Sequence, residues 1–320
     1  MKEIKGKTAL GVLEILKKER RCSGESMAAK LGVSRASVWK AVRALRGAGY
    51  EIDGGSGRGY ALKECRAPRA SGVLAAAGEA KAPLFLFKSV PSTNDVALEL
   101  LKEKCPHLTA VVANAQSEGR GRVGRKFFSP AGTGIYMSVV VRSVKTYEEL
   151  LVVTPAAAVA VRRAIADVFG LDTRIKWVND LYFCGKKVCG ILTQSAVDEK
   201  GALLGAVVGI GINVTGQMPP ELREKARSLK ESVSERERDA LIGATISRLS
   251  QVCAQLGERT FMNEYREFSY VIGKKVSFER GGAEYSGVAE SIDDDGALYV
   301  RAGAELIKIN SGEISLSSII

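Results

Sequence analysis

Forty consecutive residues near the N-terminus, residues 23–62, restrict the fold of this chain more than any other segment. They read SGESMAAKLGVSRASVWKAVRALRGAGYEIDGGSGRGYAL. Ser23 is a typical N-cap for a short helix. The tripeptide Gly32-Val33-Ser34 then predicts a tight turn, with Ser34 as the N-cap of a second helix over residues 35–46. Two helices joined by a three-residue turn form a helix-turn-helix.

The second of these helices is amphipathic and basic. Its apolar residues Val38, Val42 and Leu45 recur at spacings of four and three, so they share one face that packs inward. Most of its basic residues lie on other faces, where an exposed helix can enter the major groove of DNA. A helix-turn-helix that makes only protein contacts is the alternative interpretation.

A β-hairpin is expected directly after this helix, because residues 50–62 alternate apolar and polar side chains around a glycine-rich tip. Such a hairpin forms the wing of a winged helix-turn-helix, and Arg58 near its tip is placed to reach a phosphate. We expect this DNA-binding domain to span residues 1–66. Its predicted DNA contacts are Ser34, Arg35, Ser37, Lys40, Arg43 and Arg58.

The distribution of charge points in the same direction. The net charge of the 320 residues is +11, and residues 1–66 hold fifteen Lys or Arg against seven Asp or Glu, an excess of eight. A basic segment on a more neutral body is typical of a nucleic-acid-binding module, although a basic face can also serve solubility alone. No apolar run reaches membrane-spanning length and no signal peptide is recognisable, so we expect a cytoplasmic protein.

The chain is poor in the residues that hold metals or form histidine-dependent catalytic sites. Its six cysteines are scattered without a C-x-x-C pair, which predicts free thiols and argues against zinc. There is one histidine, His107, so a Ser-His-Asp or Cys-His site that needs further histidines is excluded. We expect no metal held by the protein's own side chains.

The remaining chain predicts an α/β (α+β) body followed by a small β-domain. Residues 67–83 are rich in Ala, Gly and Pro, which indicates a linker and then a short helix. Residues 84–270 alternate predicted strands and helices. In one of these helices, Thr154 is the expected N-cap and Pro155 the first residue. Residues 271–320 read as short alternating strands with Gly and Asp turns, typical of a small β-barrel.

A basic, glycine-rich stretch, EGRGRVGRKFFSP at residues 118–130, is the most unusual segment of that body. Three of its glycines match G-x-G-x-x-G, but a strand follows them, whereas a dinucleotide fingerprint needs a helix there. A Walker loop is excluded because no G-K-[ST] occurs. What remains is a loop in which glycines allow close approach of a ligand and arginines can bind phosphate or carboxylate. Taken alone, the segment is better interpreted as an exposed basic hairpin.

Six motifs occur in a fixed order along the body. They are STN at Ser92, then Gln116, GRGRVGRKFFSP from Gly119, KWVNDLY from Lys176, GKKVCGIL from Gly185 and GIGINV from Gly209. With the winged helix-turn-helix before them and the small β-domain after them, the chain resembles the bifunctional biotin protein ligases that are also biotin operon repressors. The resemblance runs from about residue 8 to the end. It implies a class II synthetase-like ligase domain over residues 84–270 and an SH3-like barrel over residues 271–320.

The resemblance implies a reaction in two steps. The carboxylate of biotin attacks the α-phosphate of ATP, which gives biotinyl-5′-adenylate and pyrophosphate, and a lysine of a biotin carboxyl carrier protein then displaces AMP. Mg²⁺ would shield the pyrophosphate. The implied biotin contacts are Ser92, Thr93, Asn94, Gln116, Arg120, Gly121, Arg122 and Lys187. The implied adenylate, phosphate and catalytic residues are Arg122, Lys176, Asn179, Asp180, Lys187 and Asn213.

The resemblance also implies operator DNA as a partner and a homodimer when the adenylate is bound. Two positions depart from the usual family pattern, because Phe127 stands in place of a Trp and Val178 in place of a Pro. Three alternatives stay open: a ligase that no longer represses, a non-enzymatic sensor of a small acid, and a lipoate-type acyl ligase. The full set of Arg and Lys positions disfavours the sensor, and the GRGR sequence favours biotin over lipoate.

Overall fold

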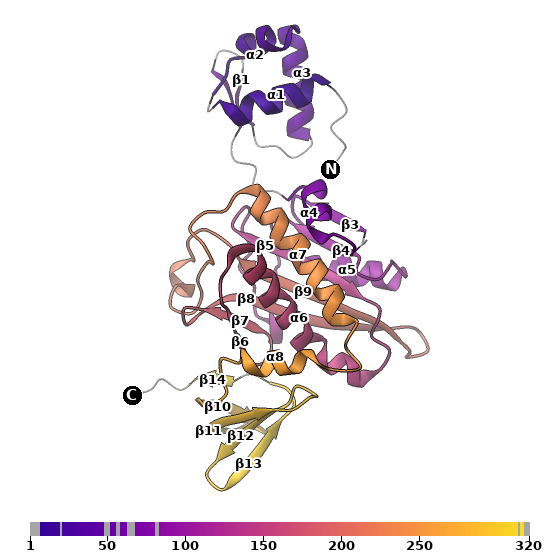
Figure 1. Ribbon diagram of the computed structural model, residues 1–320, viewed down its shortest axis with the longest axis vertical. Helices are drawn as coiled ribbons and strands as arrows, with labels where there is room; N and C mark the ends of the chain where they lie inside the picture. The colour runs from indigo at the N-terminus through magenta and orange to yellow at the C-terminus, as the bar shows by residue number, and fades with distance from the viewer. Residues whose placement is uncertain are drawn as a thin grey trace. The chain divides into compact units, whose positions relative to one another are not determined.

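The structure is a computed structural model that describes residues 7–19, 21–47, 52–55, 58–62, 68–80, 83–312 and 314–316 (Figure 1). The chain divides into two compact units, Met1–Ala67 and Pro68–Ile320. In the part of the chain that is described, no helix is long and apolar enough to cross a membrane. The described cysteines are free thiols, as predicted, whereas Cys65 lies outside the described residues.

The first unit is a three-helix domain with a two-stranded hairpin. Its elements are α1 (Lys7–Lys18), α2 (Gly24–Leu31), α3 (Arg35–Gly47), β1 (Ile52–Gly55) and β2 (Gly59–Leu62). Ser23 caps α2 by accepting a hydrogen bond from the Ser26 backbone N–H at 3.0 Å, and Gly32 ends the helix in the left-handed region. β1 and β2 pair antiparallel. The predicted helix-turn-helix and wing are confirmed, with residues 56–57 of the tip outside the described part.

One face of α3 packs inward. Val38, Val42 and Leu45 are buried, as predicted, in a core that α1 and α2 also line. Ser34 accepts a hydrogen bond from the Ser37 backbone N–H at 3.1 Å, so it caps α3 as its position in the sequence indicated. Its basic residues Arg35, Lys40 and Arg43 are exposed to solvent.

The second unit contains a seven-stranded mixed sheet in the order β3-β4-β5-β9-β8-β7-β6. Its strands are β3 (Leu84–Phe87), β4 (Ala110–Ala113), β5 (Gly134–Val141), β6 (Arg174–Lys176), β7 (Asp180–Phe183), β8 (Lys186–Val197) and β9 (Leu203–Asn213). β3 pairs parallel with β4, and the other neighbouring strands pair antiparallel. The glycine-containing strand β9 lies at the centre of the sheet.

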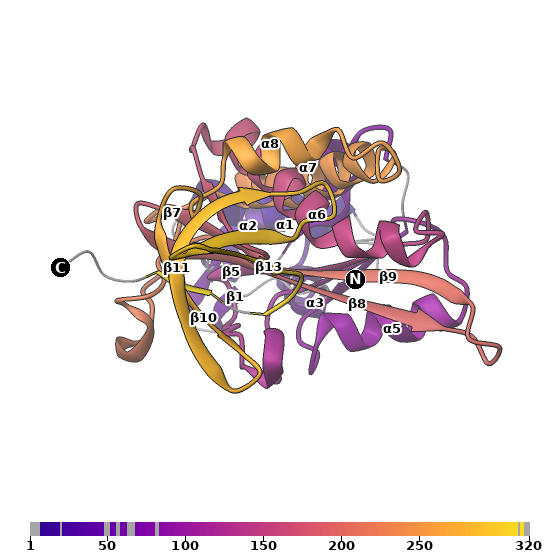
Figure 2. The same cartoon turned by 90° about the horizontal axis from the view of Figure 1, so that it is seen from below.

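Helices cover both faces of this sheet. They are α4 (Ala70–Ala77), α5 (Thr93–Lys102), α6 (Tyr147–Phe169), α7 (Glu235–Cys253) and α8 (Phe261–Glu267). Figure 2 shows α6, α7 and α8 on one face and α5 on the other. The strands alternate accordingly, since Met137 and Val139 of β5 join the large core with α6 and α7. The side chain of Val140 points to the opposite face of the sheet, where it packs with Ala97 and Leu101 of α5.

The helix predicted to begin at Thr154 begins earlier. Thr146 is the N-cap of α6 and accepts a hydrogen bond from the Glu149 backbone N–H at 3.2 Å, whereas Thr154 and Pro155 lie inside the helix. Acidic residues in the first turn favour this start through the helix dipole. The prediction was wrong because proline usually occupies the first turn of a helix, whereas Pro155 is buried in the core and the helix continues through it.

The stretch predicted as a linker, residues 67–83, contains α4, which packs against α7. Val73 and Ala77 are buried in the large core. Just before the helix, the backbone N–H and the side chain of Arg69 each donate to the carboxylate of Asp239 on α7 at 2.9 Å. Most of this stretch therefore belongs to the packed second unit.

A five-stranded antiparallel sheet forms the C-terminal part, in the order β13-β12-β11-β10-β14. Its strands are β10 (Lys275–Arg280), β11 (Ala283–Ile292), β12 (Leu298–Ala302), β13 (Glu305–Ile309) and β14 (Ile314–Leu316). Its apolar residues, among them Val276 and Leu298, join the large core. The Trp177 indole N–H donates to the Gly296 carbonyl at 2.8 Å, which ties this small β-domain to the turn between β6 and β7.

Candidate functional site

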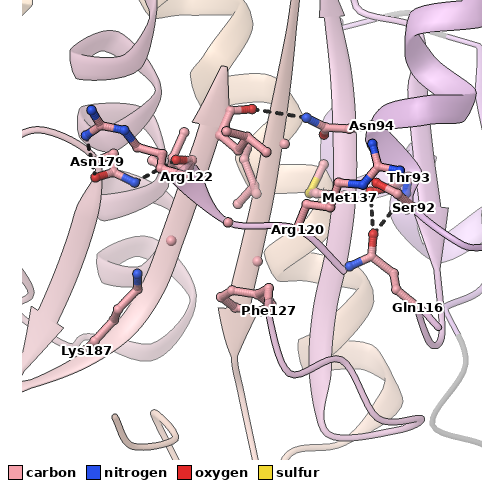
Figure 3. Close-up of a pocket in the computed structure, with 17 residues that line it drawn as sticks. Ser92, Thr93, Asn94, Gln116, Arg120, Arg122, Phe127, Met137, Asn179 and Lys187 are labelled. Atoms are coloured by element: carbon pink, nitrogen blue, oxygen red, sulfur yellow. Dashed lines mark hydrogen bonds between the residues drawn. The ribbon is translucent and has the colours of Figure 1, made fainter. Parts of the chain in front are cut away.

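A pocket lies beside the N-terminus of α5, between strands β8 and β9 and the basic stretch of residues 118–130, here called the arginine loop (Figure 3). The predicted residues that line this pocket are Ser92, Thr93, Asn94, Gln116, Arg120, Gly121, Arg122, Asn179 and Lys187. The other predicted ligand and catalytic residues, Lys176, Asp180 and Asn213, line an adjoining cavity. Arg122, Asn179 and Lys187 line both spaces, so they stand at the junction.

Two glycines of the central strand β9 form the floor of the pocket. A Cβ atom added at Gly209 would lie 2.1 Å from Oδ1 of Asn94, and one at Gly211 would lie 2.5 Å from the ring of Phe127. Only glycine leaves room for these side chains so close to the backbone. The GIGINV motif therefore sets how closely α5 and the arginine loop approach the sheet.

One end of the pocket is a network of buried and partly buried hydroxyl and amide groups. Gln116 Oε1 accepts hydrogen bonds from the backbone N–H of Thr93 at 2.9 Å and from the Thr93 hydroxyl at 3.1 Å. Gln116 Nε2 donates to Ser129 Oγ at 3.0 Å, which fixes the orientation of the amide. Ser92 is buried and makes no side-chain capping bond to α5. The STN motif thus does more than start a helix.

Ser138 and Gln194 complete this network, and the sequence analysis missed both. Ser138 on β5 is fully buried, and its hydroxyl lies 2.8 Å from Thr93 Oγ1 and 2.6 Å from Asn94 Oδ1. Asn94 Nδ2 donates to Gln194 Oε1 at 2.7 Å and to the Leu192 carbonyl at 3.3 Å. The network holds Asn94 in one orientation, so this end is preorganised for a polar group of a ligand.

The other end of the pocket carries positive charge. Arg122 donates from Nη1 to Asn179 Oδ1 at 3.3 Å and from Nη2 to the Gly312 carbonyl at 3.0 Å. Lys187 Nζ lies 2.6 Å from Asp180 Oδ1. Figure 3 shows Arg122 beside Asn179, across the pocket from Thr93, Asn94 and Gln116. Two cations placed here can offset the repulsion between a carboxylate and a phosphate that have to meet.

Asn179 is held firmly at this junction. Its Nδ2 donates to the Ile191 carbonyl at 2.8 Å, and its own carbonyl accepts a hydrogen bond from the Ile191 N–H at 2.9 Å. These bonds pin the turn between β6 and β7 to β8. Arg120, in contrast, turns to the polar end, where its Nη1 lies 2.8 Å from Oδ1 of Asp95 on α5. Its charge is therefore paired away from the junction.

Tyr182 faces the adjoining cavity and stacks on Tyr270 with ring centroids 5.1 Å apart. Lys176 Nζ lies 3.5 Å from the Tyr182 hydroxyl. Burial, together with the neighbouring Asp180 carboxylate, raises the pKa of Tyr182 to about 12, so the hydroxyl is neutral at pH 7. Tyr182 provides this wall with a hydrogen-bonding group that carries no charge.

Metal ligands and reactive thiols do not gather at the site. Within the described ranges, no three His, Cys, Asp or Glu residues come together as a metal site. His107 Nδ1 accepts a hydrogen bond from the Arg142 backbone N–H at 3.1 Å, and burial lowers the pKa of this histidine. Burial also raises the pKa of the Cys189 thiol, which therefore provides no thiolate beside Lys187.

The predicted DNA contacts belong to the first unit. Those exposed to solvent with a basic side chain are Arg35, Lys40, Arg43 and Arg58. Ser34 and Ser37 face each other at the N-terminus of α3, where their Oγ atoms lie 2.9 Å apart. The two serines shape the start of the helix, and the four basic side chains remain accessible.

Three family models match the chain in the order of its parts. An HTH domain matches residues 9–61, the biotin/lipoate A/B protein ligase family matches residues 86–213, and the biotin protein ligase C-terminal domain matches residues 271–317. Together they cover most of the described structure, including the pocket and the small β-domain.

Relatives match over nearly the whole chain. The bifunctional ligase/repressor BirA of Bacillus subtilis is 31% identical over 308 residues, covering 92% of this chain and 93% of that protein. BirA of Escherichia coli K12 is 30% identical over 313 residues with the same coverage. The solved biotin protein ligase from Aquifex aeolicus in complex with biotin and ATP matches with a TM-score of 0.61 and 27% identity, over 73% of this chain and 98% of that chain. The chain therefore belongs to the family of the bifunctional biotin ligase/repressors.

Proposed function

We propose that this protein ligates biotin to a carrier protein and also represses transcription by binding operator DNA. It joins biotin to ATP as biotinyl-5′-adenylate and passes the biotinyl group to a lysine of a biotin carboxyl carrier protein. The observation that carries the proposal is the polarity of the pocket, which has a buried hydrogen-bonding network at one end and two cations at the other. Biotin has the matching polarity, with a ureido ring at one end and a carboxylate at the other.

The buried network favours biotin over lipoate. The ureido group of biotin donates and accepts hydrogen bonds, so it can pair with hydroxyl and amide groups. The dithiolane ring of lipoate has no comparable groups and would leave buried polar atoms unpaired, at about 1–3 kcal/mol for each. The proposed contacts of the ureido ring are Ser92, Thr93, Asn94 and Gln116, and Ser138 positions two of them.

In the first step, Arg122 and Lys187 hold the biotin carboxylate against the α-phosphate of ATP. Gly121 lets the arginine loop lie close over the acyl chain of biotin, and Arg120 closes the loop onto α5 through Asp95. As the carboxylate attacks phosphorus, pyrophosphate leaves and negative charge builds on the phosphate oxygens, where fixed cations are most effective.

The adjoining cavity is the proposed nucleotide side of the site. Lys176 and Asn213 line it, and Asn179 fixes the guanidinium of Arg122 at the junction. In the second step, the Asp180 carboxylate is placed to hold the ammonium of the carrier lysine beside Lys187. The amine, once it has lost a proton, attacks the acyl carbon, and the bond to AMP breaks.

Mg²⁺ would reach the site together with ATP. The described residues offer no cluster of acidic or sulfur ligands, and the Asp180 carboxylate is already paired with Lys187. This donor set fits an ion held mainly by phosphate oxygens and water, which is the usual arrangement for Mg²⁺. Its charge shields the leaving pyrophosphate.

The proposal gives each part of the chain one task. Residues 1–66 bind the operator, residues 84–270 carry out the ligation, and residues 271–320 form the SH3-like domain. Residues 67–83 lead from the first of these parts to the second and add α4 to its packing. The proposed DNA contacts are Ser34, Arg35, Ser37, Lys40, Arg43 and Arg58. A homodimer on two DNA half-sites when the adenylate is bound, and a cytoplasmic location, complete the proposal.

A transfer assay tests the ligase half of the proposal. Full-length protein is mixed with biotin, ATP, Mg²⁺ and a purified biotin carboxyl carrier domain, and the carrier is followed by intact-mass spectrometry. We expect a mass increase of one biotinyl group, none for a carrier whose acceptor lysine is changed to arginine, and none with lipoate. Transfer of lipoate alone would move the protein to the lipoate-type ligases, and no transfer of either acid would contradict the proposal.

A further inference from the structure

The helix α3 exposes a tryptophan, Trp39, to solvent. Trp39 is 52% exposed, whereas Trp177, the second of the two tryptophans in the chain, is 4% exposed and has its indole N–H bonded. Among the side chains of the first unit whose exposure the structure describes, Trp39 is the one large apolar side chain left in solvent. Trp39 is not part of the core of this unit, which Val38 and Val42 help to fill.

The neighbours of Trp39 leave it accessible. Arg35 and Arg43, one turn before and after it, are exposed and share its face of the helix. Ala36, three residues before Trp39, is also exposed, and its side chain is too small to shield the indole. A broad surface can therefore approach the helix closely and meet the ring and the two guanidinium groups together.

The charges around Trp39 indicate the kind of surface that it meets. The sequence of α3, RASVWKAVRALRG, holds four basic residues and no acidic one. The Arg43 guanidinium carbon lies 5.5 Å from the centroid of the Trp39 ring, which is a cation–π contact. Such a face repels a basic protein surface and suits a polyanion that also offers apolar groups.

Duplex DNA fits this description, because its major groove presents thymine methyl groups between two rows of phosphates. We propose that Trp39 is a specificity-determining residue that packs its indole against thymine in the operator, while Arg43 beside it contacts the DNA backbone. This inference rests on the proposed DNA-binding function and adds to it the residue that reads an apolar group on a base.

The proposal assigns different tasks to two neighbouring residues, which DNA-binding measurements can separate. The probe is the duplex that full-length wild-type protein, supplied with biotin, ATP and Mg²⁺, selects from a randomised library. Trp39→Ala should lower affinity for this duplex roughly tenfold, the usual effect of losing one base contact, and should leave affinity for a scrambled duplex nearly unchanged. Arg43→Ala should weaken binding to both duplexes and reduce the slope of log K against log[salt] by about 1.

Uracil substitution tests the thymine contact directly, because uracil lacks only the methyl group. Replacing thymines of the selected duplex one at a time should reveal a position where wild-type protein loses affinity and Trp39→Ala does not. Trp39→Phe, which keeps an aromatic ring, should retain part of the sensitivity. Leu74→Ala, a change at an exposed apolar residue of the second unit, is the matched control and should bind every duplex like wild type.

Tryptophan fluorescence provides a second readout that needs no change in affinity. The duplex should shift or quench the emission of wild-type protein, and this change should be absent in Trp39→Phe because Trp177 is buried away from solvent. Acrylamide should quench Trp39 efficiently in the free protein.

The outcomes separate this inference from the proposed function. If wild-type protein binds no duplex in a salt-dependent manner, the DNA-binding function itself is wrong. Suppose that wild-type protein binds the duplex and that Trp39→Ala has the same affinity, the same preference for the selected over the scrambled duplex, and the same loss of affinity on uracil substitution. Only the role of Trp39 is then overturned. Resistance of Trp39 to acrylamide without DNA would also overturn it, because another protein surface would then cover the ring.

Discussion

Adding one methyl group at Gly209 should disable the polar end of the pocket. The Cβ atom of alanine at this position would lie 2.1 Å from Oδ1 and 2.8 Å from Cγ of Asn94, far inside an ordinary contact, so the amide has to move. Moving it breaks its hydrogen bonds to Gln194 at 2.7 Å and to Ser138 at 2.6 Å. Two such bonds contribute about 1 kcal/mol each. We therefore expect Gly209→Ala to weaken biotin binding by about 2 kcal/mol, which is roughly 30-fold.

The assay for this prediction is biotin-dependent exchange of pyrophosphate into ATP, with KM measured separately for each substrate. KM for biotin should rise by that factor, and KM for ATP should stay close to wild type because the nucleotide cavity does not contact Gly209. The control is the same change in an Asn94→Ala background, where it should have little further effect because the clashing amide is gone. An unchanged KM for biotin, or an equal loss in both backgrounds, would refute the reasoning.

Other residues give further predictions. Arg122→Gly removes a cation worth about 3 kcal/mol at the junction, so the adenylate should escape on the order of 100 times faster and label lysines of an unrelated protein; retention equal to wild type would contradict this. Arg238→Met leaves the carbonyls of Gly132 and Gly134 without the buried guanidinium that donates to them, and should lower the free energy of unfolding by about 3 kcal/mol. An unchanged urea midpoint would speak against that role. Burial lowers the pKa of His107 in the folded protein below the value of 6.5 expected for the unfolded chain. The neutral histidine therefore stabilises the folded state above pH 6.5, and this contribution is lost as pH falls through the lower, folded pKa. His107→Gln should therefore show a shallower fall of Tm below neutral pH, and identical profiles would exclude this source of acid sensitivity.

The first unit could be predicted from the sequence because its determinants are local. Ser23 and Ser34 cap helices through backbone groups three residues away, and Gly32 ends a helix by its own left-handed conformation. The helix around Pro155 could not be placed in this way. Its start depends on Thr146 and Glu149, and its continuation through proline depends on burial in a core assembled from distant segments.

Site residues that belong to a recognisable motif could be predicted from the sequence. Site residues that come from a strand distant in the sequence could not. Thr93 and Gln116 stand in recognisable motifs, but Ser138 lies 45 residues from its partner Thr93, in a strand that reads as plain apolar core. The one serine within that run was the available signal. The orientation of the Arg120 side chain could not be predicted either. It depends on an ion pair with Asp95 on α5, which the sequence of the arginine loop does not indicate.

The central claim, that the pocket activates biotin, is tested most directly by pyrophosphate exchange in the wild-type protein. Purified full-length protein is incubated with ATP, Mg²⁺ and labelled pyrophosphate, with biotin, with lipoate, or with neither acid. We predict that label enters ATP only when biotin is present, because only biotin pairs with the buried network of Thr93, Asn94 and Gln116. Exchange supported by lipoate, or no exchange with either acid, would contradict the account.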